Sequence, residues 1–197
     1  MSDKHPNPVS AKFVIAGGFG VGKTTFVGSI SEIDPLRTEA KMTSASVGID
    51  DTSKIQGKTT TTVAMDFGRI TIDDDLVLYL FGTPGQDRFG FMWDDLIQGA
   101  LGAVVLVDSR RLADCFYAVD YFESRKIPFV VAVNEFDGIL AHDLDAVRKA
   151  LQVSDEVLVI SCDARNRESV KTALLSLFEV IIRKMMANAG SPAVAAG

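Results

Sequence analysis

Gly17-Gly18-Phe19-Gly20-Val21-Gly22-Lys23-Thr24 is the stretch that decides the fold of this chain. It fits the pattern G-x-x-x-x-G-K-[ST], in which glycine-rich backbone N–H groups wrap a phosphate. The apolar run 13–16 precedes it and the helix-compatible run 25–33 follows it, which is the strand–loop–helix context that the motif needs. The stretch therefore predicts a phosphate-binding P-loop, with an ordinary glycine-rich turn as the alternative.

The residues of this loop have expected roles toward a nucleotide. The helix that follows adds positive partial charge near a bound phosphate. Lys23 is expected to reach the β- and γ-phosphates, and the Thr24 hydroxyl to bind Mg²⁺. The predicted nucleotide contacts from this part of the chain are Gly17, Gly18, Phe19, Gly20, Val21, Gly22, Lys23, Thr24 and Thr25.

Apolar runs alternate with helical patterns along the rest of the chain. Several runs are apolar on both faces, which indicates parallel strands covered by helices. The expected strands are 12–16, 63–72, 76–81, 102–107, 128–133 and 156–161. The expected helices are 23–33, about 88–98, 111–125, 143–151 and 167–187, with Asn166 as the N-cap of the last.

These elements predict a three-layer α/β fold of the P-loop NTPase type. The polar turn 73–75 between two strand-like runs adds one antiparallel strand to a mostly parallel six-stranded sheet with helices on both faces. The stretch 34–62 is expected to be a long functional loop. We expect a flexible segment at 1–10, a single domain at 11–187 and a disordered tail at 188–197.

Composition excludes several classes of protein. The net charge of −6 comes without a basic block, which argues against nucleic acid and anionic lipid as partners. The two cysteines, Cys115 and Cys162, fit a reduced cytoplasmic setting. Because no apolar run approaches the ~20 residues of a membrane span and no lipidation motif is present, we expect a cytoplasmic protein. It would have no direct membrane anchor, and partners would recruit it peripherally.

Three further segments follow predicted strands: Gly82-Thr83-Pro84-Gly85-Gln86, Asn134-Glu135-Phe136-Asp137 and Ser161-Cys162-Asp163-Ala164-Arg165. Their order and spacing resemble the D-x-x-G-Q, N-K-x-D and S-A-K segments of Ras-like small GTPases. Over about residues 11–187 the chain looks most like the bacterial GTPases of conservon operons and, more distantly, the gliding-motility GTPases. The resemblance implies a molecular switch that binds GTP or GDP with Mg²⁺ and hydrolyses GTP slowly.

The resemblance also assigns base-binding roles. Asn134 and Asp137 would hold guanine, because a carboxylate accepts from both the N1–H and the 2-amino group, donors that adenine does not present. The backbone N–H of Ala164 would reach the guanine O6. The flanking base contacts would be Cys162, Asp163 and Arg165. A plain helix-capping turn is the alternative for 134–137.

The remaining roles concern hydrolysis. Gln86 would orient the attacking water, and the Gly85 amide would touch the γ-phosphate. Thr62, with Thr61 as second choice, would bind Mg²⁺, because 62–67 resembles the T-I-G-V-D-F of Rab-like proteins; a run that simply opens a strand is the alternative. The implied catalytic set is Gln86, Lys23 and Thr62, and the implied metal ligands are Thr24 and Thr62.

Four departures from the family pattern affect the expected chemistry. Gly82 replaces the aspartate that normally holds Mg²⁺ through water, so metal would bind more weakly or through other groups. Glu135 replaces a lysine that packs on the base, which would cost about 1–2 kcal/mol of guanine affinity. Asp163 and Arg165 replace the serine and lysine of S-A-K. Phe19 would crowd the catalytic glutamine, which predicts slow intrinsic hydrolysis.

Several alternatives stay open. Arg37 or Arg88 could act as an internal arginine finger, or be solvated. The apolar run 89–93 is either a partner surface or core. The conservon resemblance implies a Roadblock-type regulatory protein and a sensor-kinase-like membrane complex as partners. The rival functions are a hydrolysis-deficient nucleotide-binding scaffold and a P-loop ATPase or kinase of another class.

Overall fold

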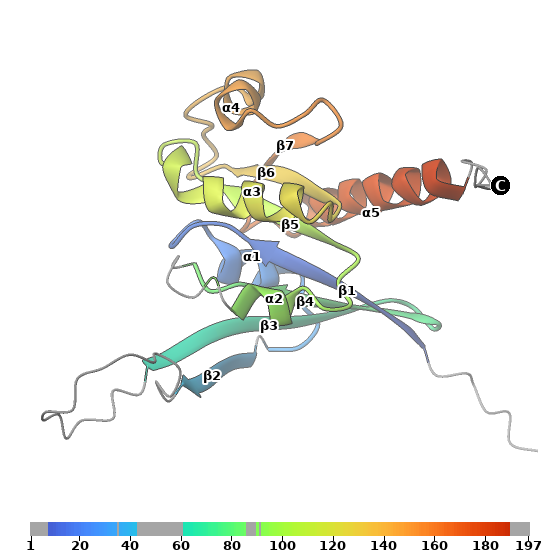
Figure 1. Ribbon diagram of the computed structural model, residues 1–197. Coiled ribbons are helices and arrows are strands. Elements are labelled where there is room, and N and C mark those ends of the chain that lie inside the picture. The colour runs from blue at the N-terminus through green and yellow to red at the C-terminus, as the bar shows by residue number, and fades with distance from the viewer. Residues whose placement is uncertain (1–7, 35, 43–60, 86–89, 91, 190–197) are drawn as a thin grey trace, which may run out of the picture.

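The computed structural model describes residues 8–34, 36–42, 61–85, 90 and 92–189. Within these residues, seven strands form one sheet in the order β2-β3-β4-β1-β5-β6-β7 (Figure 1). β3 runs antiparallel to both of its neighbours, and all other pairs along the β4-β1-β5-β6-β7 side are parallel. The strands are β1 (Val9–Ala16), β2 (Leu36–Met42), β3 (Thr61–Asp73), β4 (Leu76–Gly82), β5 (Gly102–Val107), β6 (Phe129–Asn134) and β7 (Val159–Cys162).

Four α-helices and the short 3-10 helix η2 lie between these strands in the described part of the chain, and a fifth α-helix follows β7. They are α1 (Lys23–Ile30), α2 (Trp93–Leu96), η2 (Leu112–Cys115), α3 (Phe116–Ser124), α4 (Leu144–Leu151) and α5 (Arg167–Ala189). The predicted cap of α5 is confirmed, because Asn166 Oδ1 accepts from the backbone N–H groups of Glu168 and Ser169 at 2.9 and 3.1 Å.

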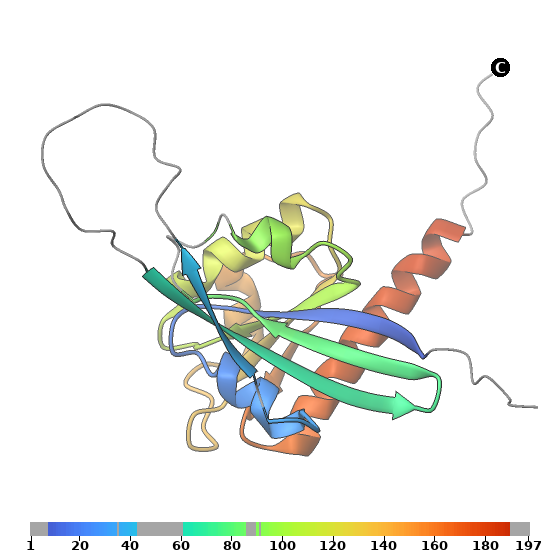
Figure 2. The same cartoon turned by 90° about the horizontal axis from the view of Figure 1, so that it is seen from below.

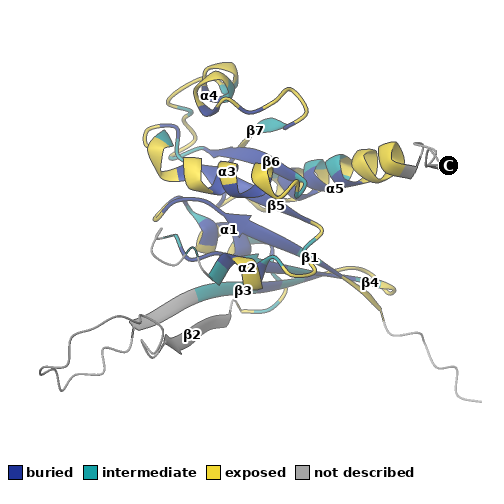
Figure 3. Cartoon of the chain, viewed as in Figure 1, coloured by how far each residue is buried: buried dark blue, intermediate teal, exposed yellow. Residues whose placement is uncertain are grey.

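The helices cover both faces of the sheet, and successive strand residues point to opposite faces. Phe13 and Ile15 of β1 pack into the layer that contains α1 and α5. Val14 and Ala16 pack into the layer that contains α2, α3 and α4. Figure 2 shows helices on either side of the sheet, and Figure 3 shows that the central strands are buried and the outer helix faces exposed. The predicted three-layer α/β fold is confirmed.

The sheet contains one strand more than the six predicted, because residues 36–42 were expected to lie in a long loop. β2 pairs along the first half of β3, from Leu36 opposite Phe67 to Met42 opposite Thr61. The sequence of β2 has no continuous apolar run that would predict a strand. The strand is recognised only by its hydrogen-bonded pairing with the long strand β3. The single antiparallel strand was predicted correctly, since β3 alone runs against the rest of the described sheet.

The parallel strands bring the sequence motifs to one edge of the sheet. β1, β4, β6 and β7 all end at this edge, and their last residues lead into 17–24, 82–85, 134–137 and 162–165. Ligands of open α/β sheets bind outside the carboxyl ends of the strands. This edge is therefore the place to look for a functional site.

Candidate functional site

The P-loop adopts the backbone that its glycines allow. Gly17, Gly20 and Gly22 have positive φ angles of 136°, 73° and 107°. A Cβ at Gly17 would lie 2.3 Å from the carbonyl oxygen of Leu106, so no side chain fits there. Gly22 is the N-cap of α1, which starts at Lys23. The loop thus presents a helix N-terminus to the carboxyl edge, as an anion-binding loop does.

Lys23 is buried in this loop. Its Nζ donates to the carbonyl oxygens of Gly17 at 2.8 Å and Gly18 at 2.7 Å. Burial lowers the pKa of Lys23 to about 8, and the carboxylate of Asp66 opposes part of that shift. The Lys23 amine is therefore held against the loop backbone, where the negative charge of a bound phosphate would stabilise its protonated form.

This pKa predicts a pH-dependent affinity for nucleotide. The free protein loses the Lys23 proton near pH 8, below the ordinary value of 10.5, whereas a bound phosphate favours the charged form. Binding therefore takes up a proton above pH 8, and affinity should fall by up to about tenfold per pH unit as pH rises through that window. Titrations with a fluorescent nucleotide from pH 7 to pH 10 check this. Lys149→Met, an exposed control on α4, should keep the slope, and a flat profile would contradict the assignment.

A carboxylate that the sequence reading gave no role lies beside Thr24. The Thr24 hydroxyl donates to Asp66 Oδ2 at 2.6 Å. A Cβ at Gly82 would lie 3.1 Å from the Cβ of Asp66 and 3.2 Å from its Oδ2. Asp66 on β3 therefore fills the space into which a side chain at 82 on β4 would extend.

The pairing of β3 with β4 explains this position. Phe67 lies opposite Phe81 and Gly68 opposite Leu80 in the antiparallel ladder, which places Asp66 across from Gly82 when continued by one residue. The signal was present in the sequence: Asp66 and Gly82 are each eight residues from Asp74, the centre of the turn. The missing aspartate of the D-x-x-G pattern has a spatial substitute on the neighbouring strand.

The second predicted segment is tied to the P-loop by Asn134. This buried side chain donates from Nδ2 to the carbonyl oxygen of Val21 at 2.9 Å and accepts at Oδ1 from the Ala164 N–H at 3.0 Å. The Asn134 side-chain amide thus links the end of β6 to the P-loop that follows β1 and to the segment that follows β7. The Ala164 N–H is already bonded, so a guanine O6 would have to share this donor with Asn134.

Asp137 presents its carboxylate at the same edge. Its side chain is 88% exposed and its backbone has a φ of 58°. Arg165 donates to Asp137 at 3.2 Å and to Asp163 at 3.1 Å, which raises the pKa of Arg165 above its ordinary value. The Arg110 guanidinium lies 4.0 Å from the centroid of the neighbouring Phe136 ring. The Asp137 carboxylate therefore contacts Arg165 and stays open to a ligand.

Gly85 lies directly against the P-loop. A Cβ there would be 2.6 Å from Lys23 Nζ and 2.9 Å from the Cα of Phe19. The Phe19 side chain itself is 66% exposed. The two predicted phosphate-facing elements are thus in contact, and the Phe19 ring points mainly to solvent.

The alternatives for the run 89–93 are resolved at Trp93, which is core. Trp93 is 3% exposed, and its ring lies 5.1 Å from Tyr117 and 5.0 Å from Tyr121 between centroids. Its buried Nε1 has no hydrogen-bond acceptor among the described residues. It also lines a small gap together with Gly17 and Gly85.

Trp93 should therefore report the nucleotide state. Trp93 and Gly85 line the same small gap, so a γ-phosphate that draws Gly85 toward itself would loosen the packing around Trp93, which is only 3% exposed. We expect the emission maximum of the form loaded with a GTP analogue to lie at longer wavelength than that of the GDP form. Trp93→Phe removes the signal, because this is the chain's one tryptophan. Identical spectra from two fully loaded samples would contradict a moving segment.

Some predicted residues lie outside the described part of the chain. These include Gln86 and Arg88, as well as the side chains of Arg37 and Thr62, whose backbones belong to β2 and β3. Their predicted roles stay predictions. Cys162 is buried, which raises the pKa of its thiol to about 11, and its predicted contact with the base stays a prediction.

Among the described residues, no group of three or more His, Cys, Asp or Glu side chains is arranged to hold a metal ion. No described helix combines the length and apolar character needed to cross a membrane.

Comparisons with known proteins agree with this geometry. A family described as "Conserved hypothetical ATP binding protein" matches residues 15–184. The chain is 32% identical over 128 residues to the uncharacterized protein MJ1339 of Methanocaldococcus jannaschii, covering 64% of this chain and 70% of that protein. It also resembles the solved FeoB G-domain from Methanococcus jannaschii, with 15% identity, a TM-score of 0.57 and coverage of 88% and 98% of the two chains. At that identity the structural likeness concerns the fold.

Proposed function

The chain belongs to the family of conserved hypothetical ATP-binding proteins, and we propose that its nucleotide is GTP, which it hydrolyses slowly to GDP as a molecular switch. It is a nucleotide-binding P-loop protein with a fold like that of a G-domain. The choice of guanine over adenine, the hydrolysis and the switching are the proposed parts.

The observation that carries the proposal is the exposed carboxylate of Asp137 beside the P-loop. Asn134 fixes its segment to Val21 of the loop and to Ala164 of the third segment. A carboxylate accepts two donors from the Watson–Crick edge of guanine, whereas it meets an unprotonated N1 in adenine. The same group would thus attract GTP and reject ATP.

The phosphate end of the site supports hydrolysis. The Lys23 ammonium and the P-loop N–H groups would stabilise the charge on the β- and γ-phosphates. Thr24 Oγ1 and Asp66 Oδ2 lie 2.6 Å apart and are the oxygen donors that Mg²⁺ prefers. Bound there, Mg²⁺ would neutralise charge on the β- and γ-phosphate oxygens. Gln86 is proposed to orient the water that attacks the γ-phosphate.

Switching would follow from the contact between Gly85 and the P-loop. Gly85 lies against Lys23 and Phe19, so a γ-phosphate bound by Lys23 would meet the Gly85 backbone directly. Removal of that phosphate would release the contact, which is the general mechanism by which nucleotide hydrolysis reorders loops. We propose that the exposed Phe19 ring obstructs the approach of a catalytic group from a partner, which would favour slow turnover.

The test combines three measurements: the identity of the nucleotide that co-purifies, the relative affinities for GTP and ATP, and the rate of GTP cleavage in a single turnover. We expect the nucleotide that co-purifies to be GDP or GTP, and GTP to bind at least tenfold more tightly than ATP. We expect GTP cleavage near the intrinsic rate scale of about 10⁻⁴ s⁻¹, faster in Phe19→Gly. Tighter ATP binding would instead support an ATPase, and tight GTP binding without any cleavage would support a nucleotide-binding scaffold.

We further propose that the chain acts as a conservon-type switch with a Roadblock-type regulatory partner, within a sensor-kinase-like membrane complex. Only the sequence resemblance supports these partners. Pull-down with a Roadblock-type protein, with the chain loaded with GDP or with a GTP analogue, tests the idea. Equal retention in both nucleotide states would count against a switch.

A further inference from the structure

The C-terminal half of α5 carries large apolar side chains that are open to water. Leu175 and Ile182 are each 52% exposed, and Met185 and Met186 are 65% and 69% exposed. The core side of the same helix is a different set of residues, namely Val170, Ala173, Leu174, Leu177 and Ile181. Figure 3 shows the last turns of α5 as exposed. An exposed apolar surface of this kind marks an interaction site.

The spacing of these side chains is that of a helix that packs against another helix. Leu175, Phe178, Ile182 and Met185 follow one another at intervals of three, four and three residues, as the a and d positions of a two-helix seam do. We call these four residues the α5 stripe. The Phe178 ring lies 4.6 Å from the ring of Phe13 between centroids, so Phe178 forms the border between the core and the stripe.

The stripe is complementary to itself. An order of three, four and three residues is the same in both directions, so an antiparallel α5 helix from a second copy matches it position by position. Leu175 then lies opposite Met185 of the second copy, and Phe178 lies opposite its Ile182, about a two-fold axis near residue 180. Such a contact is isologous, as in closed dimers of identical chains.

The charges beside the stripe favour the antiparallel arrangement over a parallel one. Glu179 and Arg183 form an ion pair at 3.5 Å along the helix, and their side chains are 63% and 71% exposed. In the antiparallel pair, Glu179 also lies near Arg183 of the second copy, and the same contact occurs twice. A parallel pair would instead place Glu179 beside Glu179 and Lys171 beside Lys171, and like charges in contact oppose association.

The stripe lies away from the candidate nucleotide site. α5 begins directly after the segment 162–165 at the P-loop edge, and Figures 1 and 2 show its last turns projecting past β5 and β6 at the other end. A second copy on the stripe would therefore leave the P-loop edge open. The proposed nucleotide chemistry does not account for the stripe and does not depend on it.

We propose that the α5 stripe is the interface of a homodimer, in which α5 packs antiparallel against α5 of a second copy of this chain. The contact removes the exposed parts of Leu175, Ile182 and Met185 from water, which drives association. Met186 lies beside the seam, where its flexible side chain adapts to the facing helix. A seam from one helix is smaller than a standard interface of about 800 Å² per partner, so the dimer should dissociate on dilution.

The first experiment measures the mass of the full chain by analytical ultracentrifugation over about a hundredfold range of concentration. We expect the average mass to rise from 21.2 kDa toward twice that value as the concentration increases. Ile182→Glu places an unpaired charge in the seam and should raise the dimer dissociation constant about tenfold or more. Ile72→Glu is the matched control, because Ile72 on β3 is 49% exposed and lies outside the stripe. The control should leave the constant unchanged.

Cysteine cross-linking tests the register of the two helices. Leu175→Cys combined with Met185→Cys should give a covalent dimer on mild oxidation, because these positions face each other across the two-fold axis. Leu175→Cys alone should not, since its two copies are separated by ten residues, about 15 Å along the helices, which is too far for a disulfide. The natural Cys115 and Cys162 are both buried.

Charge reversal tests the contact between Glu179 and Arg183 of the second copy. Glu179→Arg should weaken the dimer, and Glu179→Arg with Arg183→Glu should restore most of the affinity. These substitutions and Ile182→Glu are on exposed side chains, so circular dichroism and nucleotide binding should match those of the unaltered chain.

Three results would overturn the proposal. The first is a monomer at every concentration, and binding of that monomer to phosphatidylcholine vesicles would identify a lipid surface as the occupant. The second is a dimer with the same dissociation constant in Ile182→Glu and Ile72→Glu, which would place the interface elsewhere. The third is a covalent dimer of Leu175→Cys alone, which would show a parallel pair. None of these results bears on nucleotide binding, so the two proposals can fail separately.

Discussion

Asp137→Asn should invert the base preference of the protein from guanine to xanthine. The variant keeps one uncharged acceptor oxygen for N1–H, but it presents an N–H₂ donor to the guanine 2-amino group, and that donor instead matches the xanthine O2. Hydrogen bonds to a charged partner contribute about 1.5–3 kcal/mol each, so two weakened bonds correspond to about 3 kcal/mol. We expect GTP affinity to fall about 100-fold and XTP affinity to rise. Competition binding with GTP, XTP and ATP measures both changes.

Asp163→Asn is the matched control for this prediction. Like Asp137, Asp163 accepts from the Arg165 guanidinium, but its carboxylate also accepts from the Arg165 backbone N–H, and its side chain is 24% exposed against 88% for Asp137. The control should keep the preference for GTP. An equal loss of GTP affinity in both variants would show that the Arg165 contacts, and not base recognition, were disturbed. Unchanged GTP affinity in Asp137→Asn would refute the guanine assignment.

Asp66→Asn should raise the Mg²⁺ concentration needed for half-maximal nucleotide binding and hydrolysis by about 10–100-fold. That range is typical when a partner of a metal site is removed. The substitution keeps the shape of the side chain beside the Thr24 hydroxyl and removes its charge. Titration of Mg²⁺ at constant nucleotide measures the change. Asp74→Asn, in the exposed turn between β3 and β4, should behave like the unaltered protein.

A double variant makes the test specific for position. Asp66→Gly with Gly82→Asp moves the carboxylate from β3 to the neighbouring residue of β4, where the ladder leaves room once Asp66 is removed. The double variant should recover most of the lost Mg²⁺ affinity. If Asp66→Asn and the double variant both have the Mg²⁺ requirement of the unaltered protein, Asp66 is not part of the metal site.

The sequence predicted the parts of this fold that depend on local pattern. The run 17–24 has glycines where the backbone has positive φ, and 103–107 and 129–133 are apolar on both faces as buried parallel strands are. The strand 36–42 was missed because it is an edge strand whose sequence is polar, so its pairing with β3 and not its composition defines it.

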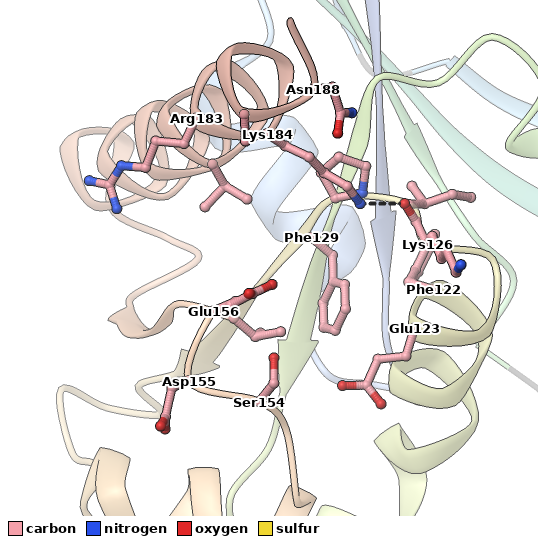
Figure 4. A pocket seen from close by; sticks show the side chains of 15 residues that line it. Phe122, Glu123, Lys126, Phe129, Ser154, Asp155, Glu156, Arg183, Lys184 and Asn188 are labelled. Atoms are coloured by element: carbon pink, nitrogen blue, oxygen red, sulfur yellow. Dashed lines mark hydrogen bonds between the residues drawn. The ribbon is translucent and has the colours of Figure 1, made fainter. Parts of the chain in front are cut away.

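The residues of the candidate site also fall into those that a local sequence motif predicts and those that depend on strand pairing. Asn134 and Asp137 belong to one contiguous segment, so the resemblance could find both. The role of Asp66 depends on the strand next to its own, and it appears only when the register of the β3–β4 ladder is worked out. A groove of about 790 Å³ between the end of α3, the start of β6, the loop before β7 and the last turns of α5 was not predicted, because its lining comes from separate parts of the chain (Figure 4).

The position of Asp66 on β3 has a mechanical consequence. β3 is paired antiparallel on both sides and its ladder with β4 already contains a register irregularity between Thr71 and Asp73. A slip of two residues keeps side chains on the same face and moves them by about 6.7 Å along the strand. Such a slip would carry the carboxylate out of reach of Thr24, whereas a carboxylate on β4 would stay beside β1. Under the proposed assignment of Asp66 to the metal site, retention of the cation would depend on how β3 and β4 are aligned.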